Sequence, residues 1–286
     1  MAMFPRTEVE GISLPRMLMG TNWILGYSHR STASDNLIKR RNGNAENIAA
    51  IADAYMEYGI DAMMSIGFPE GEPLREGLRM VEEKYGHEIT KISTPIINVN
   101  DSAEGRKEAE ATFARMEKEG SKICLIHHSS CEQLINKNKQ TMDRLPDYLD
   151  MIRQHNMVPG LSAHMPEVIQ YSDKNEYDVQ TYIQIYNCMG FLMQIEVEGV
   201  NDIIWHAKKP VMTIKSMAAG RTTPFVGLNF SYNTLRPCDM VTLGAFTPEE
   251  VHEDVEIAMA ALERRRPDVG RRSSPNVTSI LAGYKK

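Results

Sequence analysis

The sequence predicts a single (β/α)8 barrel, in which eight parallel strands are each followed by a helix. Strand-like and helix-like segments alternate eight times along the 286 residues. The strand segments are nearly continuous apolar runs, which is typical of parallel strands covered on both faces. Two strands, residues 157–161 and a strand ending at Asn187, are separated by little more than a short helix. Such strands must be parallel neighbours, because a crossover between parallel strands needs a connection of this kind.

The first half of the chain is predicted to supply four of the eight units. We expect strands at residues 15–20, 61–66, 89–99 and 123–127. We expect helices at residues 45–58, 73–85, 102–119 and between 142 and 155. Gly59 and Gly120 stand where two of these helices end, as glycine often does. The polar stretch 27–44 is predicted to be a loop on the catalytic side and a candidate lid, since loops beyond about 12 residues are usually functional or disordered.

The second half is predicted to supply the other four units. Strands are expected at residues 157–161, up to 187, 211–215 and 240–243. Helices are expected after Pro166 and at residues 200–208, 225–235 and from 247 onward. Thr247, Pro248 and Glu250 give the last helix a threonine cap, a proline in its first turn and a glutamate that can close a capping box. We therefore assign residues 1–263 to the barrel and 264–286 to a basic C-terminal tail.

The composition narrows the class of partner. A net charge of −6 argues against a nucleic-acid surface, because such surfaces concentrate basic residues, so we expect a small-molecule substrate. No stretch approaches the roughly 18 apolar residues of a membrane helix, and we expect no membrane partner and a cytoplasmic location. The four cysteines form no C-x-x-C pair, which favours neither a disulfide framework nor a zinc-thiolate site. A homo-oligomer is compatible with this composition.

A barrel of this kind places its chemistry at the carboxyl ends of the strands. The polar residues and glycine expected there are Asn22, Ser65, Thr94, His127, His128, Ser162, His164, Gln184, Tyr186, Lys215, Ser216 and Gly244.

Several of these residues stand in longer motifs. They are Gly59-Ile60-Asp61, Leu125-Ile126-His127, the turn Ser162-Ala163-His164-Met165-Pro166-Glu167, Gln184-Ile185-Tyr186-Asn187, Lys215-Ser216-Met217-Ala218-Ala219-Gly220-Arg221, and Gly244-Ala245-Phe246-Thr247-Pro248-Glu249-Glu250. In order, spacing and type the set resembles the aldo/keto reductases over roughly 200 residues. The resemblance implies that the Ser162 turn and the strand end at Tyr186 hold the nicotinamide side of the site.

The resemblance also implies where a cofactor would bind. Its cofactor residues correspond to Lys215, Ser216, Gly220, Gly244, Thr247 and Glu253. Reductases of this family that prefer the 2′-phosphorylated cofactor carry basic residues after the last strand, but residues 244–254 contain no lysine or arginine. Any nicotinamide cofactor would therefore be NAD rather than NADP, and loss of the cofactor fits the sequence as well. Glu249 and Glu250 already complement the helix dipole and would oppose an anion unless they turn outward.

The catalytic residues depart from the family pattern. The family protonates its substrate with a tyrosine tuned by an aspartate and a lysine and assisted by a histidine. Here Met64 stands at the aspartate, Phe68 or Pro69 at the tyrosine, and Pro95 at the lysine, so only the histidine remains, as His127. Neither methionine nor proline can supply the missing charge, and the sequence therefore predicts a divergent site.

The remaining candidates are given provisional roles. We expect His127, His164 and Tyr186 to be catalytic, and the substrate-binding residues to be Asn22, Tyr27, Arg30, Ser162 and Gln184. For each histidine a buried structural role is an alternative, and His128 is expected to be solvated because its strand parity is opposite to that of His127. Lys215 is either a phosphate contact or a solvated strand end. A metal held by His127, His164 and Glu196 is weighed, but no metal is assigned.

Three hypotheses for the function follow. The leading one is a small-molecule enzyme that acts on a polar carbonyl or sugar-type substrate with His127 as acid, base or carbonyl polariser. The second is an NAD-dependent oxidoreductase in which Tyr27 or Tyr186 replaces the proton donor. The third is a non-catalytic binding or assembly protein that kept the barrel and lost the chemistry. The fold alone does not decide among them.

Overall fold

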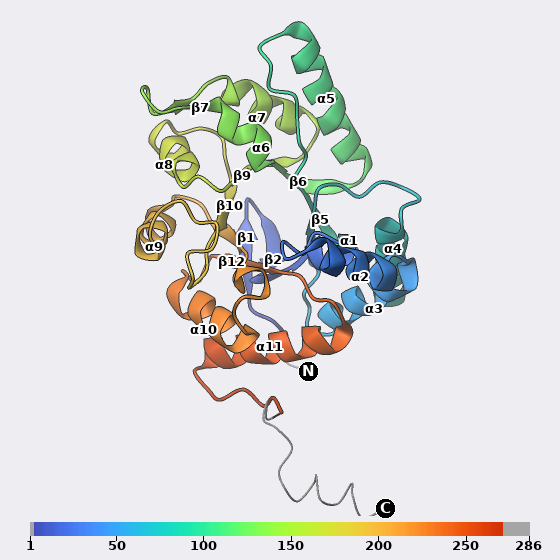
Figure 1. Ribbon diagram of the computed structural model, residues 1–286. Helices are drawn as coiled ribbons and strands as arrows, with labels where there is room; N and C mark the ends of the chain where they lie inside the picture. Colours follow the sequence, from blue (N-terminus) through green and yellow to red (C-terminus); the bar gives the residue numbers. More distant parts are fainter. Residues whose placement is uncertain (1–2, 271–286) are drawn as a thin grey trace, which may run out of the picture.

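Eight parallel strands close into a barrel in the computed structural model, which describes residues 3–270 (Figure 1). The predicted (β/α)8 fold is therefore confirmed. In order around the barrel the strands are β10 (Thr181–Ile185), β11 (Val211–Ile214), β12 (Met240–Leu243), β3 (Met17–Gly20), β4 (Ala62–Ser65), β5 (Thr90–Ser93), β6 (Ser121–Ile126) and β9 (Val158–Ala163).

Eight helices of the described chain surround these strands and cover their outer face (Figure 1). They are α3 (Ala45–Met56), α4 (Pro73–Tyr85), α5 (Ala103–Lys118), α7 (Leu145–Gln154), α8 (Glu167–Lys174), α9 (Val197–His206), α10 (Pro224–Thr234) and α11 (Pro248–Glu263). The predicted caps of two of them form: the Ser102 side chain accepts the N–H of Gly105, and the Thr247 side chain accepts that of Glu250. Local sequence signals thus set where these helices begin.

Side chains alternate between two apolar layers. Leu18, Ile92, Ile123 and other inward residues fill the barrel, whereas Met19 and Tyr186 belong to the larger core between the strands and the helices. Because successive strand residues point to opposite faces, this alternation decides which residues can reach the inside of the barrel.

A β-hairpin that the sequence analysis did not predict closes one end of the barrel. It consists of β1 (Arg6–Val9) and β2 (Ile12–Pro15), paired in antiparallel fashion. Val9 and Leu14 are buried in the same cluster as the inward residues of the barrel strands. The turn signal is Glu10-Gly11, where both residues have positive φ (47° and 79°), as short hairpin turns require. Strands of four residues are too short to show a clear period, so the hairpin was missed.

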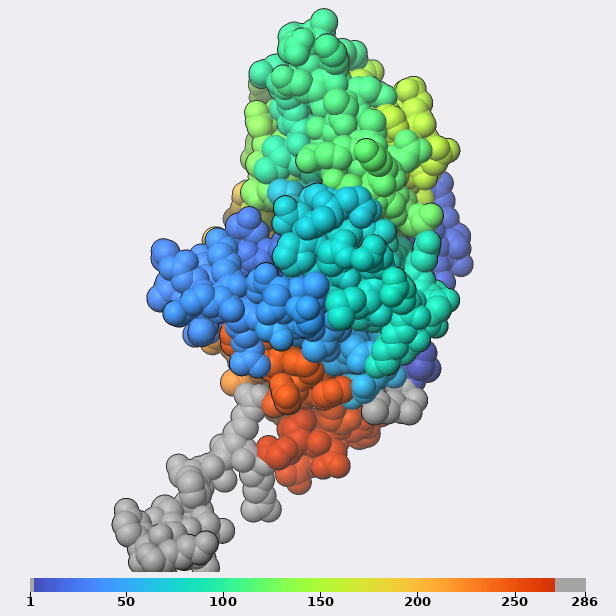
Figure 2. Space-filling view, turned by 90° about the vertical axis from the view of Figure 1, so that its right-hand side faces the viewer, coloured from blue at the N-terminus to red at the C-terminus, as the bar shows by residue number. Residues whose placement is uncertain are grey.

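Residues 27–44 were predicted to be a loop, but much of this segment is helical, so that part of the prediction was wrong. Its role as a lid stays a prediction. Helix α2 (Thr32–Asn42) lies within the segment, and the short helix α1 (Asn22–Leu25) precedes it. Figure 2 shows this blue part of the chain projecting from the body of the molecule. The Ser31 side chain caps α2 by accepting the N–H of Ser34. The basic residues of α2 lie in its last turn, where cations complement the helix dipole. These charges therefore stabilise the end of α2.

Short elements between β6 and α7 also escaped prediction. They are α6 (His128–Cys131), the 3₁₀ helix η1 (Glu132–Leu134), and the strand pair β7 (Ile135–Asn136) and β8 (Thr141–Met142). A second 3₁₀ turn, η2 (Ala218–Gly220), follows β11. None of the helices in the described part of the chain has the length and apolar composition needed to cross a membrane.

The last helix, α11, ends at Glu263. Arg265 pairs with Glu256 and Glu263 of that helix. Residues 271–286 of the predicted tail lie outside the described residues.

Candidate functional site

A cavity of about 420 Å³ lies at the carboxyl ends of the barrel strands. This is the end at which barrels of this class carry their sites. The residues expected at the site that line this cavity are Asn22, Tyr27, Ser65, Thr94, His127, His128, Ser162, His164, Lys215, Ser216, Gly220 and Gly244. Ser65 and Ser216 are almost completely buried, and their hydroxyl oxygens have no hydrogen-bond partner among the described residues. The cavity wall therefore contains two buried hydroxyl groups that lack a partner among the described residues.

Three histidines form one cluster on the cavity wall. The rings of His127 and His128 have centroids 4.2 Å apart, and those of His128 and His164 stack with centroids 3.8 Å apart and planes 20° apart. His127 directly follows β6 at a position where the strand alternation points the side chain into the barrel, as expected. His128 was expected to be solvated, but the chain turns into α6 at this residue, strand parity no longer applies, and the ring faces the cavity.

The ring of His127 is held by its own turn. Its Nδ1 accepts the backbone N–H of Ser129 at 3.3 Å and lies 2.8 Å from the Ser129 hydroxyl oxygen. A nitrogen that accepts from a backbone N–H carries no proton, so the proton of the neutral ring is on Nε2. Burial, followed by the charges of His128 and Lys215, lowers the pKa of His127 to about 4. The ring is therefore neutral at pH 7 and offers an N–H donor.

His164 and Lys215 complete the charged part of the wall. Burial, then His128 and Lys215, lowers the pKa of His164 to about 3. Burial also lowers the pKa of Lys215. Lys215 leaves strand β11 with a φ of 63°, a left-handed conformation that a non-glycine residue rarely adopts. The strand alternation ends at this point, and the lysine side chain lines the cavity instead of pointing away from it.

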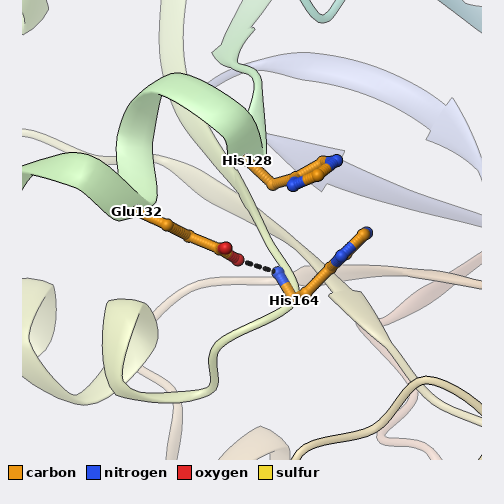
Figure 3. Close-up of side chains that lie close together, drawn as sticks. All are labelled: His128, Glu132 and His164. Carbon is orange, nitrogen blue, oxygen red and sulfur yellow. Dashed lines mark hydrogen bonds between the residues drawn. The ribbon is translucent and has the colours of Figure 1, made fainter. Parts of the chain in front are cut away.

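A metal-ligand set exists, but it is not the one considered from the sequence. One ligand atom from each of His128, Glu132 and His164 lies within 4.8 Å of the other two. Figure 3 shows the two imidazoles side by side and Glu132 pointing toward His164 from the helical segment that carries His128. Glu196, which the sequence analysis considered, is exposed at the start of α9. Glu132 was missed, although its spacing of four from His128 on a helical turn is a signal that sequence reading could have used.

Gln184 and Tyr186 were expected at the site, but neither lines the cavity. Ile183 and Ile185 take the inward positions of β10, so the residues between and after them point to the helix layer. The Tyr186 hydroxyl donates to Thr234 Oγ1 at 2.9 Å, and its ring packs on Phe230. Gln184 is fully buried and donates to the backbone oxygen of His164 at 3.3 Å. The expectations of a catalytic tyrosine and a substrate-binding glutamine here were wrong.

Three further residues expected at the site also lie off the cavity wall. Arg30 is exposed, with its guanidinium beside Gly220. Thr247 is used as the cap of α11, and Glu253 lies within that helix. Residues that line the cavity and were not expected there include Trp23, His29 and Met217. They come from the segments after β3 and β11, whose paths the strand pattern does not predict.

Comparison with known proteins identifies the fold. No protein-family model matches the chain, and curated proteins give no match either. Among solved structures, a putative aldo-keto reductase from Pseudomonas aeruginosa matches with a TM-score of 0.62 and 15% identity, over 90% of this chain and 95% of that one. The barrel has the aldo-keto reductase fold.

Two other solved structures with this fold also match the chain. An aldo-keto reductase from Klebsiella pneumoniae in complex with NADPH matches with a TM-score of 0.57 and 14% identity, over 96% of this chain and 98% of that one. An aldose reductase from Giardia lamblia matches with a TM-score of 0.52 and 10% identity, over 92% of this chain and 94% of that one. These similarities support the resemblance read from the sequence.

The structure places the three residues that the resemblance assigns to the reductase relay. Met64 lines the cavity, Phe68 is fully buried, and the carbonyl of Pro95 accepts the N–H of His127. Of the residues that the resemblance assigns to a nicotinamide cofactor, Lys215, Ser216, Gly220 and Gly244 line the cavity, whereas Tyr186 does not. The side chain of Asn42 donates to the carbonyl of Trp23 in α1 and to that of Phe246 in the loop after β12, and so joins these two segments. We derive no reaction step through such a cofactor.

Proposed function

We propose that this protein is an enzyme that transfers a proton beside the carbonyl group of a small polar or sugar-type substrate, without the reductase relay. The observation that carries the proposal is that His127 and Lys215 line one cavity at the strand ends of an aldo-keto reductase barrel. One offers a neutral N–H donor and the other an amine, which are the two groups that enolisation needs.

His127 is the group that polarises the carbonyl. With Nδ1 occupied by Ser129, its Nε2–H can donate to the carbonyl oxygen of a substrate. A neutral imidazole is a suitable donor to a developing enolate, because it stabilises the negative charge without needing to be charged itself. The lowered pKa of His127 keeps the ring in this form at neutral pH.

Lys215 is the group that exchanges the proton. Burial favours its neutral amine, and lysines with lowered pKa values act as bases near neutral pH. In its charged form the same side chain attracts an anionic substituent of the substrate. No ion pair or hydrogen bond engages the Lys215 side chain within the described part of the chain, so the amine is available to a ligand.

The cavity suits a hydroxylated molecule. Its volume of about 420 Å³ lies within the usual range of small-molecule sites. The side chains of Asn22 and Ser162 provide polar groups along the wall. The proposal also includes a single barrel with a basic tail and a small molecule as partner. A cytoplasmic location is part of it, and the buried free thiols of Cys124 and Cys131 are consistent with a reducing compartment.

Deuterium exchange tests this proposal whatever product the enzyme forms. The full chain is incubated in D₂O with a panel of hydroxyketones, aldoses, ketoses, their phosphates and 2-oxo acids, and NMR follows deuterium at the carbon beside the carbonyl. We expect incorporation that depends on the protein and is lost in His127→Asn and Lys215→Met. His206→Asn, on the exposed face of α9, is the matched control and should exchange at the wild-type rate.

Two other results would favour the alternative hypotheses. Exchange that appears only after addition of NAD, together with a change in its absorbance, would support the oxidoreductase. Saturable binding of a panel member with no exchange above the protein-free rate would support a binding protein.

A further inference from the structure

We infer that His128, Glu132 and His164 form a binding site for one divalent transition-metal ion at the wall of the cavity. The inference goes beyond the proposed proton transfer and does not depend on it. It rests on the three ligand atoms that converge within 4.8 Å in the described chain.

The fold brings the three side chains together from two neighbouring strands. β6 and β9 are parallel neighbours in the barrel, and His128 and His164 follow their carboxyl ends. Glu132 lies one helical turn after His128, so the two side chains share one face of the segment. The site is therefore built on the rigid barrel wall and not on a long loop.

Hydrogen bonds fix the carboxylate in place. Glu132 Oε1 accepts the backbone N–H of His164 at 2.5 Å and of Met165 at 3.0 Å (Figure 3). These two bonds use one oxygen of the carboxylate. They leave the second oxygen, Oε2, as the atom that we assign as ligand. A ligand oriented in this way loses little freedom when an ion binds.

The donor set selects the class of ion. Two imidazoles and one carboxylate suit zinc, iron, manganese, cobalt or nickel, whereas calcium and magnesium prefer oxygen ligands throughout. Three protein ligands leave coordination positions open. Because His128 and His164 line the cavity, the open positions face the space where a substrate would bind.

Binding requires a small rearrangement of the rings. Metal–ligand distances of about 2.0–2.2 Å place the ligand atoms of a tetrahedral site roughly 3.4 Å apart. The present atoms are up to 4.8 Å apart, with the two rings stacked. Rotation of the two imidazoles out of the stacked arrangement would bring their nitrogens together around the ion, while Glu132 stays fixed.

Lys215 is the charged group that opposes the ion. Its charge acts on both His128 and His164, and His29 also acts on His164. The Glu132 carboxylate opposes this positive charge. A cation at the site would therefore bind more tightly once Lys215 is replaced by an uncharged side chain of similar length.

Metal titration of the full chain, without any histidine tag, tests the inference. Zn²⁺ binding is measured by calorimetry after chelator treatment and dialysis, and Co²⁺ binding by its visible absorption. We expect one equivalent of either ion. His128→Asn, His164→Asn and Glu132→Gln should each weaken binding at least about tenfold, as even outer contacts of a metal site do. Lys215→Met should tighten binding by about tenfold.

Two features make the titration decisive. Glu132→Gln keeps an oxygen that can accept the two backbone N–H groups, so the turn remains folded while the charged ligand is lost. His206→Asn controls for ions held by exposed histidines, and His127→Asn should leave the stoichiometry at one. Binding that survives both His128→Asn and His164→Asn, or no stoichiometric binding at all, would overturn the assignment. Because this experiment measures metal binding and not activity, a negative result would not change the interpretation of the deuterium-exchange experiment.

Discussion

The Nδ1 atom of His127 lies 2.8 Å from the hydroxyl oxygen of Ser129 and accepts the backbone N–H of the same residue. This turn places the imidazole proton on Nε2. Ser129, two residues further along the same turn, thus determines which ring nitrogen of His127 can donate.

His127→Asn should abolish most of the exchange activity. Loss of an acid or base group typically lowers a rate by about 10² to 10⁴. The ring lines a cavity and bonds only to its own turn, so the melting temperature should stay nearly unchanged. Rate and thermal denaturation are measured on the same preparation. Full activity would transfer the role to His164, and an unfolded variant would favour a structural histidine.

We expect the protein not to oxidise NADPH at a useful rate with common aldehydes. The sequence resemblance assigns Met64 and Pro95 to positions of the relay, and Tyr186 is buried behind its strand. Absorbance at the nicotinamide band, followed with a panel of aldehydes, checks this expectation. Saturable oxidation that depends on the protein would show that another group has taken over the proton donation.

Asp254→Asn should stabilise the fold at alkaline pH. Asp254 lies buried on α11, and burial, with Glu250 nearby, raises the pKa of its carboxyl from 3.8 to about 8. The folded state therefore holds this proton more tightly than the unfolded state, and stability falls as pH rises from about 4 to 8. Asparagine removes the charge that must otherwise form in the core.

Thermal denaturation at pH 5 and pH 9 measures the effect. The Asp254→Asn variant should gain most over the wild type at pH 9 and least at pH 5. Asp150→Asn, an exposed change on α7, should alter the melting temperature little at either pH. An equal gain at both pH values would mean that the carboxyl of Asp254 does not titrate in this range.

Gly160→Ala should destabilise the barrel. A Cβ on Gly160 would lie 2.7 Å from Leu125 Cγ and 2.9 Å from the carbonyl oxygen of Thr181. Overpacking of this kind costs about 1–3 kcal/mol of unfolding free energy. Urea denaturation measures it, with Gly270→Ala as the control, because a methyl group there meets open space. Equal stability of the two variants would mean that β6 and β9 can separate slightly at no cost.

The fold was predictable because its signals are local and repeated. Apolar strands, helix caps such as Ser102 and Thr247, and the eightfold alternation all lie within short windows of sequence. The site was harder to predict. Strand parity would have excluded Gln184 and Tyr186 once Ile183 was assigned to the interior, but the motif resemblance outweighed that argument.

Other parts of the site depend on where the chain leaves regular structure. His128 enters the cavity because a helix begins there, and Lys215 because the backbone adopts a left-handed conformation. Neither event has a strong signal in the residues themselves. Glu132 is recognisable as a candidate ligand only because His164 lies nearby, and the parallel pairing of β6 and β9 brings the two residues together.

The hairpin of β1 and β2 has a consequence for the passage of molecules. Within the described residues, Val9 and Leu14 fill the amino-terminal end of the barrel with apolar side chains, so the cavity opens at the carboxyl ends of the strands. Under the proposed function, a substrate would enter and its product would leave past the same residues, among them Tyr27 and His29. Release of the product through this shared opening would then limit the rate of turnover, because a new substrate could not bind while the product occupies the cavity.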